Sequence, residues 1–248
     1  MSAAATYEAI ASVYDAYTAH YDSEGWIEDL LLILERRGLH HGALLDVGCG
    51  TGESFLTMLE KDWEVTACDI SPAMLAVAAE KAGDRARLEV ADMRELPRFG
   101  TFDLIWALDD AVNYLLDTAE LEAALRGMRA NLAPKGLLLF DANCLPAYRT
   151  FFAETHEFEL QDGREMTWRG DAPKDAEPGS TCEATMLIDG AVFATHRQRH
   201  FPAREVLETL KRAGLECLDV YGQGTDGIPR KPLDEGTHTK AIYIARAA

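Results

Sequence analysis

The amino-acid sequence predicts an α/β fold. A seven-stranded, mostly parallel sheet is expected to be covered by helices on both faces, with a small antiparallel β lid inserted after the fifth strand. From residue 43 to residue 141, short apolar runs alternate with amphipathic helical stretches, as in parallel sheets. The alternation then stops. A polar stretch with Pro173, Pro178 and several glycines follows, and two more apolar runs come after it.

The expected elements follow from hydrophobic periodicity and from capping residues. Strands of the main sheet are predicted over residues 43–47, 64–68, 86–90, 102–107, 137–141, 215–220 and 241–244. Helices are predicted over residues 6–20, 26–37, 51–61, 72–81, 118–132 and 202–212. Ser71 and Pro72 are a typical cap and first-turn residue. Antiparallel strands are expected over residues 157–160, 165–169, 181–188 and 192–200, while Pro134-Lys135-Gly136 is predicted to be a turn.

These elements divide the chain into three parts. Residues 1–40 are expected to form an N-terminal helical cap, and residues 41–142 together with 201–248 the sheet domain that holds the ligand. Residues 143–200 form the insertion. Parallel sheets bind ligands at the carboxyl ends of their strands, so an insertion that leaves the fifth strand would lie over the site.

Charge and cysteine usage narrow the function classes. The formal net charge of −18 repels phosphate backbones, which makes nucleic acids and anionic membranes poor partners. Five scattered cysteines argue against a disulfide framework and against a Cys-x-x-Cys zinc site, and no metal site is expected. Neither a signal peptide nor a membrane-spanning run is visible. We therefore expect a cytoplasmic protein with a small-molecule partner, either a monomer or a homodimer.

A glycine-rich turn, Leu45 to Gly52, joins the first strand to the next helix. Its glycines let the backbone approach a ligand closely. They occupy the first, third and fifth positions (Gly48, Gly50, Gly52), whereas a dinucleotide-binding turn needs the first, third and sixth. The sixth position is Glu53, whose carboxylate disfavours a pyrophosphate, and the lysine of a P-loop is missing. The alternative is a tight strand–helix connection that binds nothing.

Two aspartates follow the next two strands. Asp69 ends the second strand, where a carboxylate can accept hydrogen bonds from both ribose hydroxyls, although it could also cap the helix at Pro72. Asp92 and Met93 follow the third strand, where a carboxylate can accept from an adenine amino group while an apolar neighbour packs on the ring. The alternative for Asp92 is a plain turn residue. Together with the glycine turn, these positions favour a nucleoside ligand.

In this order the motifs resemble those of the class I S-adenosylmethionine (SAM)-dependent methyltransferases, which have a Rossmann-like sheet. The match covers residues 44–139 and the last two strands. The resemblance implies SAM as cofactor and S-adenosylhomocysteine (SAH) as product, with Gly48 and Gly50 near the methionine portion. The expected cofactor-binding residues are Tyr14, Asp46, Gly48, Gly50, Asp69, Ile70, Met74, Asp92, Met93 and Leu108.

A narrower resemblance is to small-molecule enzymes with a β insertion. It is carried by Tyr14-Asp15, Asn113-Tyr114-Leu115 and His196-x-x-Arg199-x-Phe201-Pro202. Such enzymes include bacterial methyltransferases of unknown substrate and aminosugar N,N-dimethyltransferases. The expected substrate-binding residues are Asn113, Tyr114, Asn143, Tyr148, Trp168 and Arg199; Tyr148 and Trp168 could instead form the core of the lid.

His196 is the candidate general base. An alcohol, phenol or ammonium group must lose a proton before it can be methylated, and histidine suits this at neutral pH. On a strand, His196, Gln198 and His200 share one face, and Arg197 and Arg199 share the other. If the even face points into the site, His196 acts there and the arginines are solvated or paired. A structural or surface histidine is the alternative.

These residues favour an enzyme that transfers a methyl group to an O or N atom of a small molecule, of the kind found in secondary metabolism. Two alternatives stay open. One is a SAM-binding enzyme that modifies SAM itself. The other is a non-catalytic SAM-binding regulator.

Overall fold

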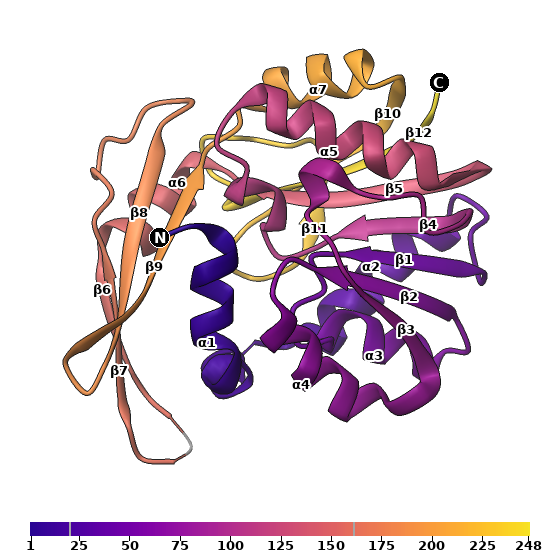
Figure 1. Cartoon of the computed structure of the whole chain (residues 1–248). Coiled ribbons are helices and arrows are strands. Elements are labelled where there is room, and N and C mark those ends of the chain that lie inside the picture. The colour runs from indigo at the N-terminus through magenta and orange to yellow at the C-terminus, as the bar shows by residue number, and fades with distance from the viewer. Residues whose placement is uncertain (20, 161) are drawn as a thin grey trace.

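The computed structural model describes residues 1–19, 21–160 and 162–248, which form two sheets with helices around them (Figure 1). The main sheet has the strand order β11-β10-β12-β5-β4-β1-β2-β3. Its strands are β1 (Ala43–Val47), β2 (Glu64–Asp69), β3 (Ala86–Val90), β4 (Phe102–Ala107), β5 (Leu132–Asn143), β10 (Leu215–Gln223), β11 (Pro229–Arg230) and β12 (Lys240–Ala247). β1 to β5 pair in parallel, whereas β12 runs antiparallel to β5 and β10.

The prediction of seven strands is wrong by one, because β11 adds an eighth to the edge of the sheet. This strand contains only Pro229 and Arg230 and pairs antiparallel with the end of β10. Two residues carry no periodic pattern, and proline is a poor strand signal. Tertiary contact with β10, not local sequence, therefore creates this strand.

Helices cover both faces of the main sheet. On one face lie α5 (Thr118–Asn131) and α7 (Ala203–Arg212), and on the other lie α2 (Ser23–Glu35), α3 (Glu53–Glu60) and α4 (Pro72–Ala82). Successive side chains of a strand point to opposite faces. Leu44 accordingly packs in the core with α2, α3 and α4, while Leu45 packs in the core with α5 and α7.

Some element boundaries differ from the prediction. Helix α1 (Ala3–Thr18) begins earlier than expected, because the Ser2 side chain accepts a hydrogen bond from the Ala5 N–H. Its expected end, His20, lies outside the described residues. The predicted turn at residues 134–136 lies within β5, where a register shift against β4 accommodates it. A Cβ on Gly136 would lie 2.6 Å from the Phe102 carbonyl oxygen, so only glycine fits.

The second sheet is antiparallel and follows β5 and the short helix α6 (Leu145–Arg149) in sequence. Its strands are β6 (Thr155–Glu159), β7 (Glu165–Gly170), β8 (Thr181–Ile188) and β9 (Ala191–Arg199), paired in sequence order. Helix α1 lies between this sheet and the main sheet (Figure 1). The Thr6 hydroxyl donates to the Thr195 carbonyl at 2.7 Å, and the Glu8 carboxylate accepts from Ser71 and Ala73 of α4. Helix α1 thus connects the two sheets.

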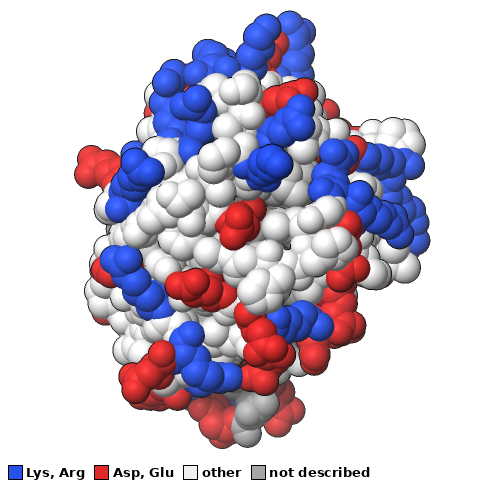
Figure 2. Space-filling view, turned by 90° about the vertical axis from the view of Figure 1, so that its right-hand side faces the viewer, with Lys and Arg blue, Asp and Glu red and all other residues white. Residues whose placement is uncertain are grey.

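The two N-terminal helices pack in different places. Ile10, Val13 and Tyr17 of α1 belong to the apolar core of the antiparallel sheet, whereas Ile27 and Leu30 of α2 belong to the core of the main sheet. The surface charges are unevenly spread. On the face that Figure 2 shows, Lys and Arg gather in the upper part and Asp and Glu below. No helix in the described part of the chain has the length and apolarity needed to cross a membrane.

Candidate functional site

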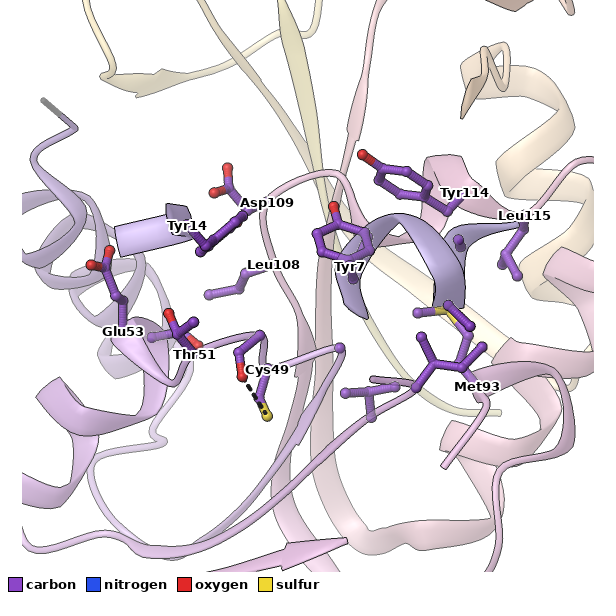
Figure 3. A pocket seen from close by; sticks show the side chains of 18 of the residues that line it. Tyr7, Tyr14, Cys49, Thr51, Glu53, Met93, Leu108, Asp109, Tyr114 and Leu115 are labelled. Atoms are coloured by element: carbon purple, nitrogen blue, oxygen red, sulfur yellow. Dashed lines mark hydrogen bonds between the residues drawn. The ribbon is translucent and has the colours of Figure 1, made fainter. Parts of the chain in front are cut away.

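A cavity of about 400 Å³ lies at the carboxyl ends of β1, β2 and β4. Its floor is the glycine turn after β1, and α1 contributes Tyr7 and Tyr14 to its wall (Figure 3). Eight of the sequence-predicted site residues line it: Tyr14, Gly48, Gly50, Ile70, Asp92, Met93, Leu108 and Tyr114. This cavity is where a parallel sheet is expected to hold a ligand.

The glycine turn has the backbone that close approach to a ligand requires. Gly48, Gly50 and Gly52 have φ values of 78°, 53° and 95°, a region that other residues adopt at a cost. A Cβ on Gly48 would lie 3.2 Å from the Ala111 side chain and 3.5 Å from that of Met93. A side chain at this position would therefore fill part of the cavity floor, which the glycine leaves open.

Asp69 braces this turn from behind and does not line the cavity. One carboxylate oxygen accepts from the Gly50 N–H at 2.9 Å, and the other accepts from the Ser71 N–H at 2.8 Å. Burial raises the pKa of Asp69, while these backbone hydrogen bonds oppose the shift. The position is that of the predicted ribose contact, but the observed partners are backbone groups. Each oxygen has a further lone pair, so a ligand hydroxyl could still be accepted.

Two other predicted cofactor residues also lie outside the cavity lining. Asp46 is buried in β1 and accepts a hydrogen bond from the Ser54 hydroxyl, and burial raises its pKa to about 7. Met74 is buried in the core that α1 shares with the antiparallel sheet. Asp46 thus connects β1 to α3, Met74 packs α4 against α1, and neither residue lines the cavity.

Asp92 lines the cavity but already has a partner. Its carboxylate accepts hydrogen bonds from the Arg94 guanidinium, which also pairs with Glu120. Although partial burial works against it, this guanidinium lowers the pKa of Asp92, which is therefore ionised at neutral pH. Met93 lies beside it on the cavity wall, as the predicted adenine contact requires.

A cluster of charges follows β4. Asp109 and Asp110 have φ values of 60° and 54°, which non-glycine residues rarely adopt. The Asp141 carboxylate holds this backbone by accepting from the N–H groups of both residues. Lys240 places its ammonium 2.8 Å from Asp109, 3.0 Å from Asp141 and 3.9 Å from Asp110. Backbone strain of this kind is common at functional sites.

These three carboxylates share a single ammonium group. Burial raises the pKa of Asp110 to about 7 against the opposing effect of Lys240. Burial lowers the pKa of Lys240, but the charges of Asp109, Asp141 and Asp110 outweigh it and raise that pKa well above its usual value. Lys240 is therefore always protonated. Among the described residues, no group of His, Cys, Asp or Glu side chains has the arrangement of a metal site.

Five predicted substrate-binding residues do not line the cavity: Asn113, Asn143, Tyr148, Trp168 and Arg199. Asn113 accepts from the Asn143 N–H and donates to the Arg199 carbonyl. Asn143 and Tyr148 both donate to Gln198, while Arg199 pairs with Glu205. These side chains form a buried network that fixes β9 against the main sheet. Trp168 packs in the core of the antiparallel sheet.

His196 lies behind the cavity wall. It is 3% exposed, and its Nδ1 lies 2.7 Å from the hydroxyl of Tyr114, which does line the cavity. Burial lowers the pKa of His196 to about 4, so the imidazole is neutral at physiological pH. The condition under which His196 would act as the base, an even face that opens into the site, is not met in this cavity. Gln198 and His200 are buried as well, and Arg197, from the other face, lines the cavity.

Several cavity residues were not among the predicted ones, including Tyr7, Glu53, Asp109 and Arg197. Tyr7 stands one heptad before Tyr14 on the same face of α1, so the periodicity carried a signal for it. For Asp109 the signal is its position two residues after the end of β4. Arg197 carried none, since its direction depends on how β9 is placed against the main sheet.

Comparison with known proteins places this geometry in a family. A family model described as a methyltransferase domain matches residues 44–136. The Bacillus subtilis (strain 168) protein YqeM, described as a methyltransferase, is 29% identical over 90% of this chain and 92% of its own length. Trans-aconitate 2-methyltransferase of Deinococcus radiodurans is 32% identical over 76% of this chain and 70% of its own length.

A solved structure agrees with these relatives. The sugar N-methyltransferase KedS8 from Streptoalloteichus is 26% identical and superimposes with a TM-score of 0.71. The superposition covers 95% of this chain and 93% of KedS8. The resemblance seen in the glycine turn and the two following aspartates is thus confirmed at the level of the family. The chain belongs to the SAM-dependent methyltransferases.

Proposed function

We propose that this protein transfers a methyl group from SAM to an N or O atom of a small molecule. The observation that supports the proposal is that one cavity is lined by the glycine turn and the Asp92–Met93 wall and also by Tyr7, Asp109 and Tyr114. A cofactor on the turn and an acceptor beside the tyrosines would then share one enclosed space. Proximity of this kind supplies much of the rate enhancement in transfer reactions.

The residues present fit the cofactor. Gly48 leaves open the space that a side chain would fill, while Asp92 and Met93 offer a carboxylate and an apolar surface to a nucleoside. SAM supplies an activated methyl group when bound. The protein's own residues bind and orient the two reactants, and α1 with the antiparallel sheet excludes water. We propose that residues 143–200 act as a lid and that residues 1–40 form a helical cap. Residues 41–142 together with 201–248 form the sheet domain that holds SAM.

The acceptor class rests on relatives and on the enclosure of the cavity. A trans-aconitate 2-methyltransferase and a sugar N-methyltransferase are among the similar proteins, and both names denote small acceptors. The cavity volume of about 400 Å³ is within the range of small-molecule sites. We propose a cytoplasmic enzyme that needs neither nucleic acid nor membrane and acts as a monomer or homodimer.

Incubation with methyl-labelled SAM and panels of small amines, alcohols and carboxylates tests this proposal. We expect SAH to form only when an acceptor is present, with the label recovered in the acceptor. Conversion of SAM without any acceptor would instead identify an enzyme that modifies SAM. SAM binding without turnover across all panels would support a regulator.

We propose that His196 positions the Tyr114 hydroxyl and does not itself touch the acceptor. His196→Ala should then lower turnover at least about tenfold and change SAM affinity less than about twofold, because one lost hydrogen bond to Tyr114 frees its ring. His196→Asn, whose amide can occupy the place of Nδ1, should restore much of the turnover. Between roughly pH 6 and 9 the wild-type rate should show no histidine titration. Loss of SAM affinity in His196→Ala, or a titration of the wild-type rate near neutral pH that disappears in His196→Asn, would contradict this role.

A further inference from the structure

We propose that the acceptor end of the cavity, formed by Tyr7, Tyr14, Asp109 and Tyr114, binds a cationic nitrogen group, so that the acceptor is an amine. This inference rests on the proposed function and specifies its substrate class. It follows from the aromatic rings that enclose this end and from the charges placed beside them.

The three tyrosine rings form a connected wall. The Tyr7 ring centroid lies 5.1 Å from that of Tyr114 and 6.2 Å from that of Tyr14, and both contacts are edge-to-face. Figure 3 shows the three rings above the glycine turn, with Asp109 beside Tyr14. Aromatic faces attract alkylammonium groups, and the attraction grows when the group is withdrawn from water.

The charge beside the rings has the sign that a cation needs. Asp109, Asp110 and Asp141 share one counterion, Lys240, so carboxyl groups outnumber ammonium groups three to one in this cluster. These carboxyl groups also act on the tyrosines. Burial is the largest cause that raises the pKa of Tyr14, followed by the charges of Asp109 and Asp110. Burial also raises the pKa of Tyr114, followed by the charge of Asp110. The phenols therefore stay neutral, and a cation placed between them is favoured.

The two arginine side chains that line the cavity are already paired. Arg94 contacts Asp92 and Glu120, and Arg197 lies 3.4 Å from Glu183. Arg197 is half exposed, which places it at the rim. An anionic acceptor would therefore meet excess negative charge at Asp109 and no free cation among the residues of the acceptor end.

The same arrangement suits the transfer step. An amine that enters as an ammonium group first gives one proton to the Asp109 carboxylate, whose side chain is 58% exposed and can pass it to water. The nitrogen lone pair then forms the N–C bond while the C–S bond breaks, and the electron pair of that bond stays on sulfur. Positive charge moves from sulfur to nitrogen, where Asp109 and the tyrosine rings stabilise it.

Calorimetric titration of the protein–SAH complex with choline and with 3,3-dimethylbutan-1-ol tests the inference. The two probes have nearly the same shape, but only choline carries a positive charge, and SAH lacks the sulfonium charge that could mask the effect. We expect choline to bind at least about tenfold more tightly than the alcohol, a difference of about 1.4 kcal/mol. Equal affinities, or no binding of choline, would overturn the inference.

Two variants assign the effect to this end of the cavity. Asp109→Asn should weaken choline binding at least about fivefold and leave the affinity for the alcohol and for SAH within about twofold. Asp84→Asn removes the same charge from an exposed position outside the cavity and should change nothing. An equal effect of both variants would show that only overall charge matters. Failure of SAH to bind the wild-type protein would instead contradict the proposed function itself.

Discussion

Replacing Lys240 by methionine is expected to lower the free energy of unfolding by about 3 to 5 kcal/mol near neutral pH, because it leaves buried carboxylates without their counterion. Asp141 is fully buried and lies 3.0 Å from the lysine ammonium, and the Lys240 side chain is itself only 17% exposed. Methionine keeps most of the volume, so the loss reports charge and not packing. Denaturant titration measures it.

The pH dependence identifies the cause. Burial raises the pKa of Asp141 and of Asp110, the latter to about 7, and Lys240 opposes both shifts. A carboxyl group with a raised folded pKa stabilises the fold while it is protonated, and this stabilisation is lost as pH rises through that pKa. Without Lys240 these pKa values rise further. The deficit of Lys240→Met should therefore be largest at about pH 8 and shrink towards about pH 5.

Two controls accompany this prediction. Lys240→Arg keeps a cation and should recover part of the stability. Lys135→Met makes the same replacement at an exposed position and should change the free energy of unfolding by less than about 0.5 kcal/mol. A deficit of Lys240→Met that stays constant from about pH 5 to pH 8 would mean that the lysine acts through its methylene packing.

Asp69→Ala is expected to reduce SAM affinity at least about tenfold, which calorimetry measures directly. The substitution removes the acceptor for the Gly50 and Ser71 N–H groups, each of which then costs about 1 to 3 kcal/mol if it finds no other partner. The glycine turn would lose the brace that fixes its left-handed backbone. Unchanged SAM binding in a folded variant would remove Asp69 from the site.

The experiment also separates two roles of Asp69. If the carboxylate binds the ribose hydroxyls as well as the turn, the wild-type protein should prefer adenosine over 2′,3′-dideoxyadenosine, and the variant should lose this preference. If Asp69 only braces the turn, the substitution should lower the affinity for both nucleosides by the same factor. Circular dichroism and thermal unfolding of the variant show whether the fold is kept.

The sequence predicted many of the residues that line the cavity at the strand ends, because this part of the cavity is built from local signals. Gly48, Gly50, Ile70 and Met93 follow directly on the ends of strands, and residues at the carboxyl ends of parallel strands meet at one edge of the sheet. Asp46, Asp69 and Met74 share the same signals but do not line the cavity: the two aspartates bind α3 and the turn, and Met74 is buried in the core of α1 and the antiparallel sheet. A motif fixes the position of a residue along the chain and not the direction of its side chain.

The proposed acceptor end of the cavity could not be predicted in the same way. Residues of α1, the loop after β4, β9 and β12 meet there, and they lie far apart in the sequence. The placement of β9 turned Arg197 to the cavity and buried His196, because a strand exposes alternate residues and its orientation is set by what covers each face. Lys240, which opens the last strand, became the counterion of three carboxylates only through the pairing of β12 with β5.

By itself the sequence determined the parallel sheet, the glycine turn and the chemical class of the ligand. Each of these depends on hydrophobic periodicity or on the spacing of neighbouring residues along the chain. The tertiary structure alone decided which side chains face the cavity, which only support it, and the surplus of negative charge beside the tyrosines. Those properties arise from contacts between distant segments. The placement of α1 and of the antiparallel sheet against the strand ends sets them.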